Sequence, residues 1–261
     1  EIENIELTFL TKDDYEELKE AMIHAYTSMP ESYWKEAQIE NLINIFPEGQ
    51  VVIRVNGQIA GCALSIIVDY DSFDNNHTYK QITGNFGFST HTAEGDMMYG
   101  IDVFIKPNFR GLRLGRRLYD YRKELCERIN LKGVAFGGRI PNYHKFKDEI
   151  SPKEYIERVK RKEILDPVLN FQISNDFQPV KVLKNYLEGD SASSDYAVLL
   201  EWFNIYYEKK PKQAAVTKKV VRLGLIQWQM RPYKHLDDLL EQVEYFVDAV
   251  SGYRADFALF P

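Results

Sequence analysis

Apolar and polar residues repeat with two different periods along the chain, and the changes of period predict its strands and helices. Residues 5–10 (IELTFL) alternate like a half-buried strand, whereas residues 34–46 (WKEAQIENLINIF) repeat their apolar positions like a helix and end at Pro47. Residues 50–68 return to the strand period around Asn56-Gly57. This dipeptide predicts a hairpin, because a type I′ turn needs positive φ at both central positions.

The pattern from residue 69 onward predicts a mixed α/β sheet. Residues 69–95 are polar and predict a long loop or broken strand, and residues 97–106 (MMYGIDVFIK) form a strong strand pattern followed by a Gly/Arg turn and a helix. Ser151-Pro152 and Asp166-Pro167 are typical helix starts, because Ser and Asp cap and Pro fits the first helical position. Further strands are predicted within residues 132–138, 179–187 and 195–207.

A basic run of small residues, KKPKQAAVTKK, interrupts these patterns near residue 210. We therefore predict a first domain over residues 1–210, a linker over residues 211–219 and a second segment over residues 220–261. The second segment has a new strand, helix and strand pattern, which indicates a β-α-β fragment.

Composition argues against several classes of function. The formal net charge of -6 argues against a general nucleic-acid binder, because phosphate backbones are bound by a basic excess. Cys62 and Cys126 form no CxxC pair, so neither a disulfide framework nor a metal site is indicated. The chain has no apolar run of membrane-spanning length and no signal-peptide pattern at its acidic start. We expect a cytoplasmic protein without nucleic-acid or membrane partners; association into a homo-oligomer stays open.

The most informative motif is the turn PNFRGLRLGRRL, residues 107–118, which carries four arginines: Arg110, Arg113, Arg116 and Arg117. The first turn of a helix has unpaired N–H groups and partial positive charge, so arginines there need an anion to offset the repulsion. Glycines let the main chain approach a phosphate closely. The pattern therefore predicts a pyrophosphate site, and a solvated, arginine-rich helix start is the alternative.

The sequence around this turn resembles the acetyl-CoA signature of the GNAT acyltransferase family. It has neither GxxxxGK[ST] nor a GxGxxG after its first strand, whereas VFIKPNFRGLRLGRRL has the strand, Pro, Arg-Gly, second Gly and helix of that signature. The resemblance implies a mixed, mostly antiparallel GNAT-type sheet flanked by helices. It also implies binding of acetyl-CoA or another acyl-CoA.

Carried onto this sequence, the resemblance implies a set of cofactor-binding residues. The main chain of the strand would bind the pantetheine arm, and the amides of the turn would bind the pyrophosphate. Arg113 stands where the family usually has glycine, so its side chain either pairs with a phosphate oxygen or weakens binding. Asn142 matches a position that can touch the cofactor, or is a turn residue after Pro141. The full set is Val103, Phe104, Ile105, Arg110, Gly111, Leu112, Arg113, Leu114, Gly115, Arg116 and Asn142.

Acyl transfer to an amine needs a base, because an alkylammonium must lose a proton before it attacks. Asp102 is the catalytic candidate, since it lies on the strand next to the expected thioester; a salt-bridge role is the alternative. Glu94, Asp96 and His91 are lesser candidates. The leaving thiolate usually takes a proton from an acid. The family often has a tyrosine where this sequence has Gln172, so the thiolate leaves unassisted, Tyr143 serves, or the domain is degenerate.

Residues 221–261, from VRLGLIQW to ADFALFP, resemble the first strand, helix and second strand of the nitrilase, or carbon-nitrogen hydrolase, family. In that family a glutamate directly follows F-P, and a lysine and a cysteine come later. These positions lie beyond Pro261, so the resemblance implies a truncated start of a nitrilase-like sandwich that cannot hydrolyse by itself. A βα appendage that closes the first sheet is the alternative.

The leading hypothesis is an N-acyltransferase that moves an acyl group from acyl-CoA to a small amine or a lysine by direct attack in a ternary complex. The alternative is a degenerate CoA-binding or regulatory module attached to an amidase, and a weaker one is an arginine-loop module for nucleotides or RNA. The acceptor depends on residues 69–95. Aromatic residues there suggest an apolar cleft wall or core: Tyr70, Phe73, Tyr79, Phe86 and Phe88.

Overall fold

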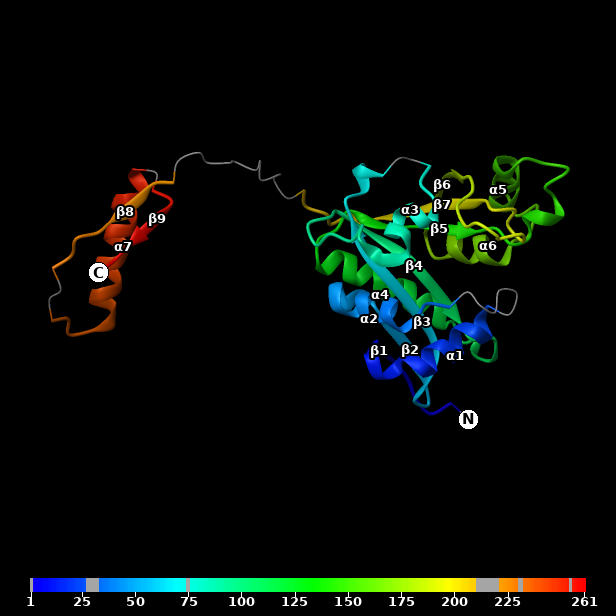
Figure 1. Cartoon of the computed structure of the whole chain (residues 1–261), viewed down its shortest axis with the longest axis horizontal. Helices are drawn as coiled ribbons and strands as arrows, with labels where there is room; N and C mark the ends of the chain where they lie inside the picture. Colours follow the sequence, from blue (N-terminus) through cyan, green and yellow to red (C-terminus); the bar gives the residue numbers. More distant parts are fainter. Residues whose placement is uncertain (1, 27–32, 74–75, 210–220, 230–231, 254) are drawn as a thin grey trace. The chain divides into compact units, whose positions relative to one another are not determined.

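The computed structural model of the chain describes residues 2–26, 33–73, 76–209, 221–229, 232–253 and 255–261. It divides into two units, Glu1–Glu208 and Lys209–Pro261, which are described separately (Figure 1). The linker predicted at 211–219 lies outside the described residues.

The first unit is built on one seven-stranded sheet with the order β1-β2-β3-β4-β5-β7-β6. Every neighbouring pair is antiparallel except β4 and β5, which are parallel. The predicted mixed, mostly antiparallel sheet is thereby confirmed. The strands are β1 (Ile5–Phe9), β2 (Val51–Val55), β3 (Gln58–Val68), β4 (Met97–Ile105), β5 (Gly133–Arg139), β6 (Gln178–Leu183) and β7 (Ala197–Phe203).

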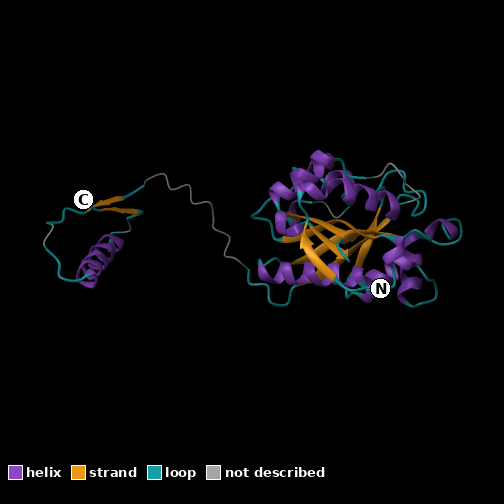
Figure 2. Cartoon of the chain, turned by 90° about the horizontal axis from the view of Figure 1, so that it is seen from below, coloured by secondary structure: helices purple, strands orange, loops and turns teal. Residues whose placement is uncertain are grey.

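Helices cover both faces of this sheet (Figure 2). One face packs against α1 (Tyr15–Ala25), α2 (Glu36–Ile45) and α3 (Tyr79–Ile82), with Leu18, Leu42 and Tyr99 in its core. The other face packs against α4 (Leu114–Arg128), α5 (Pro152–Lys160) and α6 (Pro167–Ser174), with Leu125, Phe136 and Leu200 in its core. Both layers bury apolar stripes, which is the main source of their stability.

The local turn and cap signals predict the backbone correctly. Asn56 and Gly57 have φ of 49° and 80°, as a type I′ hairpin requires. The Ser151 hydroxyl accepts a hydrogen bond from the Glu154 amide at the start of α5. Asp166 accepts hydrogen bonds from the Val168 and Leu169 amides at the start of α6. These caps satisfy amides that a helix start otherwise leaves unpaired.

Residues 69–95 differ from the prediction of a loop or broken strand. They form a short 3-10 turn at Tyr70–Ser72, helix α3 and a π-type turn at Gly84–Phe88. Ile82 and Phe88 are fully buried against the α1 and α2 layer. These apolar anchors are widely spaced among polar residues, so the overall polarity of the segment hid its packing.

The second unit contains β8 (Leu223–Leu225), α7 (Leu236–Gly252) and β9 (Phe257–Leu259). This is the predicted strand, helix and strand order. The two strands pair in parallel as a sheet of their own. Many of its large apolar side chains are exposed, among them Leu225, Leu236 and Phe257.

No helix in the described part of the chain is both long and apolar enough to cross a membrane.

Candidate functional site

The site begins where β4 bends and separates from β5. Leu64 is paired with Asp102 but the next residue, Ser65, is paired with Gly100, so Ile101 is an extra residue in β4. Such a bulge bends the strand. The parallel pairing of β4 with β5 covers only Met97–Tyr99. Beyond Tyr99 the two strands diverge, and one edge of β4 has no strand beside it.

The backbone of Val103 and Ile105 points toward this open edge. The Lys106 amide donates to the Ala60 carbonyl on β3, at 2.8 Å. Because backbone groups of successive strand residues point to alternate edges, the amides of Val103 and Ile105 face away from β3. An extended ligand with amide groups can pair with such an edge as an added strand would. Phe104 alternates with them, and its buried ring packs against Tyr26.

The turn after β4 places two residues in the left-handed backbone region. Gly111 has φ of 88°, and Arg113 has φ of 59° and precedes the first residue of α4. Glycine adopts this conformation freely, whereas a residue with a Cβ atom pays about 1–2 kcal/mol. Arg113, which stands where the family usually has glycine, therefore has a backbone conformation that favours glycine.

The start of α4 has no cap. Arg113 makes no side-chain cap hydrogen bond, and the first turn contains no acidic residue. The first amides of the helix, from Leu114 to Arg116, therefore lack the side-chain acceptor that usually satisfies them. The Leu114 side chain is buried in the core, and Gly115 packs against the Phe171 ring of α6. Only the main chain of these two residues can face a ligand.

The arginines of this turn are exposed. Arg116 lies 3.7 Å from Asp120, but no carboxylate among the described residues pairs with Arg110, Arg113 or Arg117. Leu112 is half-buried against the same core as Leu114. Unpaired guanidinium groups beside uncapped amides produce a local positive potential that suits an anion.

A cavity of about 490 Å³ lies where β4 and β5 diverge. Asp102 and Val103 from β4 and Gly137 and Arg139 from β5 line it. The same two strands also contribute Gly100, Ile101 and Phe136. The other lining residues come from the helices and loops around the strands: Tyr26, Tyr33, Trp34, Gln38, Tyr79, Phe86, Tyr119, Arg122, Val168, Gln172, Tyr186, Leu187 and Glu188.

Asp102 is one of the two carboxylates among the described residues of this lining. The Tyr26 hydroxyl donates a hydrogen bond to Oδ1, and Trp34 Nε1 donates to Oδ2 at 3.2 Å. Burial raises the pKa of Asp102, although the hydrogen bonds from Tyr26 and Trp34 and the charge of Arg122 oppose this effect. A held carboxylate with a raised pKa is suited to accept a proton from a substrate.

Arg122 on α4 holds the β4 bulge at Ile101 from the face of the sheet opposite the α1 to α3 layer. It is 2% exposed, and its Nη2 donates to the carbonyls of Leu64 and Asp102 at 2.5 and 2.7 Å, while Nε donates to Ser65 Oγ at 3.0 Å. Sequence reasoning missed this residue. Its spacing from Leu118 and Leu125, on the buried stripe of α4, was the available signal.

The lesser base candidates lie outside this lining. His91 stacks on Phe46, and its Nδ1 accepts a hydrogen bond from the Ile67 amide at 3.1 Å. Burial lowers the pKa of His91. Asp96 forms an ion pair with Lys132, and Glu94 is exposed. All three precede β4, at the end where β4 and β5 are still paired.

Gln172, which stands at the family's tyrosine position, and Tyr143, the acid candidate, have different surroundings. Gln172 lines the cavity, is 6% exposed, and its Oε1 has no hydrogen-bond partner among the described residues. The buried Tyr143 hydroxyl donates to the Ile150 carbonyl at 3.0 Å and is not part of the cavity lining.

Asn142 is engaged in a turn. Its Nδ2 donates to the Leu165 carbonyl at 3.0 Å, and its Oδ1 accepts from Lys145 Nζ at 3.1 Å. It does not belong to the cavity lining, so the arrangement favours the turn interpretation.

The aromatic wall expected from residues 69–95 divides in two. Tyr79 and Phe86 line the cavity, whereas Tyr70, Phe73 and Phe88 do not. Sequence reasoning missed the aromatic residues that other segments bring to the same cavity, because nothing local in the sequence marks them. These are Tyr26, Tyr33, Trp34, Tyr119, Phe136 and Tyr186.

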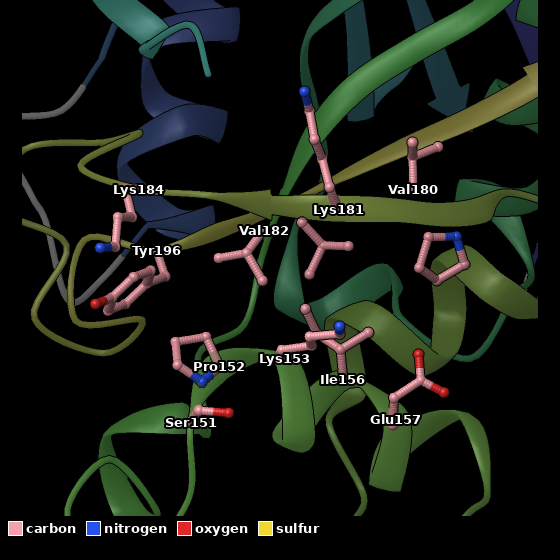
Figure 3. Close-up of a pocket in the computed structure, with 12 residues that line it drawn as sticks. Ser151, Pro152, Lys153, Ile156, Glu157, Val180, Lys181, Val182, Lys184 and Tyr196 are labelled. Atoms are coloured by element: carbon pink, nitrogen blue, oxygen red, sulfur yellow. The ribbon is translucent and has the colours of Figure 1, made fainter. Parts of the chain in front are cut away.

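A second hollow, of about 500 Å³, lies between α5 and the edge strand β6 (Figure 3). Aliphatic side chains such as Ile156 and Val182 line it together with Lys153, Lys181 and Lys184. None of the described residues in its lining belongs to the predicted cofactor or catalytic set.

The chain is similar to known proteins over most of its length. The model of the acetyltransferase (GNAT) family matches residues 15–144. The chain is 37% identical over 179 residues to the Uncharacterized N-acetyltransferase YkwB of Bacillus subtilis (strain 168), covering 69% of this chain and 79% of YkwB. It is 41% identical over 229 residues to the Probable hydrolase YhcX of the same organism, covering 87% of this chain and 45% of YhcX. The chain therefore spans less than half the length of YhcX.

Two solved structures share the fold of the first unit. The loading GNATL domain of CurA from Lyngbya majuscula aligns with a TM-score of 0.67 at 22% identity, covering 77% of this chain and 98% of that domain. The GphF GNAT-like decarboxylase, in complex with isobutyryl-CoA, also aligns with a TM-score of 0.67, at 15% identity over 76% of this chain and 98% of that one.

Proposed function

Because this chain belongs to the acetyltransferase (GNAT) family, we propose that it transfers an acyl group, acetyl or another, from acyl-CoA to a primary amine. One observation carries the proposal. The open edge of β4 leads from a partly buried carboxylate, Asp102, to the uncapped and arginine-rich start of α4. A long ligand with amides in its middle and a diphosphate at one end matches this arrangement.

In the proposed complex, the main chain does most of the cofactor binding. The pantetheine amides pair with the backbone of Val103 and Ile105, while the pyrophosphate accepts hydrogen bonds from the amides between Arg110 and Arg116. Arg113 and Arg116 add charge to that site. The complex of GphF with isobutyryl-CoA supports an acyl-CoA as the ligand, because the two proteins share a fold.

Asp102 acts as the base. An alkylammonium that enters the cavity gives its proton to this carboxylate, and the free amine then attacks the thioester carbonyl. Tyr26 and Trp34 keep the carboxylate in place through their hydrogen bonds. The oxyanion that develops on the thioester carbonyl accepts a hydrogen bond from a main-chain N–H of the β4 edge near Val103.

The lining of the cavity indicates the type of acceptor. Asp102 and Glu188 are the carboxylates of the lining, and the aromatic side chains of Tyr26 and Trp34 lie beside Asp102. The two arginines of the lining are held by other groups, Arg122 by backbone carbonyls and Arg139 by Asp190. Carboxylates and the faces of aromatic rings both attract cations. We therefore propose as acceptor a cationic amine on a small or apolar group, or a lysine side chain.

We further propose that the second unit is the start of a carbon-nitrogen hydrolase domain. YhcX, which is named a hydrolase, supports this because it is 41% identical to the chain and much longer. The exposed apolar side chains of β8, α7 and β9 also support it, since surfaces of this kind usually pack against further structure.

The alternative is a module that binds CoA without catalysis and regulates the hydrolase to which it is attached. Gln172 at the family's tyrosine position favours this alternative. The two are separated by measuring CoA binding by calorimetry and then thiol release from acetyl-CoA with a panel of amines. Amine-dependent thiol release supports the transferase. CoA binding without release from any amine supports the regulatory module, and absence of CoA binding contradicts both.

A further inference from the structure

Acyl transfer from CoA leaves a thiolate that needs a proton, and the donor in this chain is not evident from sequence. Gln172 stands at the position where a tyrosine was expected, and an amide does not supply a proton. Tyr143 does not line the cavity, and its hydroxyl donates a hydrogen bond to the Ile150 carbonyl. The donor must therefore be sought among the tyrosines that line the cavity.

Tyr186 lies at the point where β4 and β5 diverge. Its ring covers Gly137 so closely that a Cβ atom there would lie 2.2 Å from Cζ and 2.6 Å from the hydroxyl oxygen of Tyr186. The pairing of β5 with β4 ends just before, at Ala135. The hydroxyl of Tyr186 is thus held against Gly137, and both residues line the cavity together with Gly100.

Two further groups extend from Tyr186 into the protein as a buried hydrogen-bonded chain. The hydroxyl oxygens of Tyr186 and Tyr99 are 2.9 Å apart, and the Tyr99 hydroxyl lies 2.8 Å from His77 Nε2. All three side chains are buried, with exposures of 4% for Tyr186 and His77 and 0% for Tyr99. A chain of this kind can pass a proton without any large movement.

The other tyrosines of the cavity are less suited to the role. The Tyr33 ring lies 4.0 Å from Lys35 Nζ, and no hydrogen-bonded chain among the described residues leads to its hydroxyl. Tyr26 donates its proton to Asp102, and Tyr79 donates to the Ile101 carbonyl at 2.8 Å. Tyr119 comes from α4, on the face of the sheet opposite the α1 to α3 layer that holds Tyr99 and His77. Among these, Tyr186 is the hydroxyl with a proton supply behind it.

We propose that Tyr186 is the acid that protonates the leaving thiolate and that Tyr99 and His77 resupply its proton. This inference rests on the proposed acyl transfer. Asp102 takes one proton of the alkylammonium before the attack. As the new C–N bond forms and the C–S bond breaks, sulfur takes the electron pair and the Tyr186 proton, and the attacking nitrogen loses its second proton to water. The Tyr99 proton moves to the Tyr186 oxygen, and His77, which enters the step as an imidazolium, gives its Nε2 proton to the Tyr99 oxygen and becomes a neutral imidazole. The enzyme gains one proton at Asp102 and loses one at His77, so its net charge does not change.

The surroundings keep the proposed acid protonated until it is needed. Burial raises the pKa of Tyr186 and of Tyr99 well above that of a free phenol. The titratable groups near Tyr186 are Tyr70, Tyr79, Tyr99 and His77.

The first test needs only bound CoA and no acceptor. The thiol of CoA is titrated in complex with the wild-type chain by thiolate absorbance, with the complex of desulfo-CoA as the blank. A hydroxyl that donates to the sulfur stabilises the thiolate, so Tyr186→Phe should raise the pKa of the bound thiol by roughly 1 to 2. Tyr143→Phe removes the same oxygen outside the cavity and should leave that pKa unchanged.

Each outcome decides the question. If CoA binds and Tyr186→Phe titrates like the wild type, or if Tyr119→Phe alone changes the thiol, the assignment of Tyr186 is wrong while the transferase proposal stands. If calorimetry detects no CoA binding by the wild-type chain, the transferase proposal fails and the proton donor fails with it.

The second test uses turnover with an amine that supports thiol release. Tyr186→Phe should lower kcat roughly 100-fold with little change in the KM for acetyl-CoA, and Tyr99→Phe should give a smaller loss. A thioester whose leaving thiol is more acidic needs less protonation, so it should restore much of the rate of Tyr186→Phe. Equal losses with both thioesters would show that Tyr186 is only structural.

Discussion

Reversing the charge of Arg113 should weaken CoA binding while leaving the fold intact. Arg113 is exposed, has no carboxylate partner among the described residues, and directly precedes the uncapped start of α4. Because its backbone is already in the left-handed region, glutamate at this position adds no new backbone strain relative to arginine. Arg113→Glu therefore changes mainly the charge that faces the proposed pyrophosphate.

The size of the effect follows from the exposure of the site. Two unit charges 4 Å apart interact by about 1 kcal/mol in water, and a pyrophosphate carries about two charges. Charge reversal removes an attraction and adds a repulsion of similar size. After partial screening at physiological salt, we expect the Kd for CoA to rise roughly 10- to 100-fold. The change should shrink at high salt.

Arg128→Glu is the matched control. Arg128 is the last residue of α4, so the same change of charge is made about 20 Å along the helix axis from the turn. This separation exceeds the Debye length of about 8 Å. Calorimetry should therefore give a Kd near the wild-type value for Arg128→Glu. Equal weakening by both variants, or an unchanged Kd for Arg113→Glu with a wild-type melting temperature, would refute the placement of the pyrophosphate.

Three further substitutions test the site and its support. Asp102→Asn should lower kcat for thiol release roughly 100-fold. Since burial raises the pKa of Asp102, the wild type loses stability as pH rises through that pKa. The melting temperature of Asp102→Asn, measured relative to that of the wild type, should therefore increase from pH 4 to 8. Gly137→Ala forces a Cβ into the Tyr186 ring, so urea unfolding should show a loss of about 1–3 kcal/mol, together with slower turnover. Burial opposes ionisation of Asp190, but hydrogen bonds from Arg139 and Ser193 outweigh this effect and lower the pKa of Asp190. Asp190→Asn should therefore be less stable than the wild type at pH 7. The stability of the variant should also fall less than that of the wild type as pH falls through the lowered pKa. Parallel pH profiles of variant and wild type would contradict either pH argument.

The sequence predicts those parts of the fold and site that depend on neighbouring residues. The hairpin at Asn56-Gly57 and the capped helix starts are local signals, and the structure contains them. The Gly/Arg turn is equally local, because glycine and arginine alternate at the start of a strong helical stripe. The position of the unusual backbone at Arg113 follows from the same motif.

The remaining features depend on contacts between distant segments. Asp102 is 76 residues from Tyr26 and 68 residues from Trp34, and only the packing of α1 and α2 against the sheet brings these three together. The Tyr99 and Tyr186 hydroxyls are separated by 87 residues. No periodicity marks such pairs.

Residues 69–95 show a different limit of sequence reasoning. Their polarity predicts a loop, but Ile82 and Phe88 anchor the segment to the core and carry Tyr79 and Phe86 to the cavity. Burial of a few widely spaced apolar residues can order a mostly polar segment, and a sequence window averages this signal away.

The position of bound coenzyme tests the proposed function most directly. A crystal structure of the chain with acetyl-CoA should place the pyrophosphate within hydrogen-bond distance of the amides between Arg110 and Arg116. The thioester should lie in the wedge between Gly100 and Gly137, within reach of Asp102. Coenzyme density in the hollow between α5 and β6, or anywhere that leaves the start of α4 empty, would contradict the proposal.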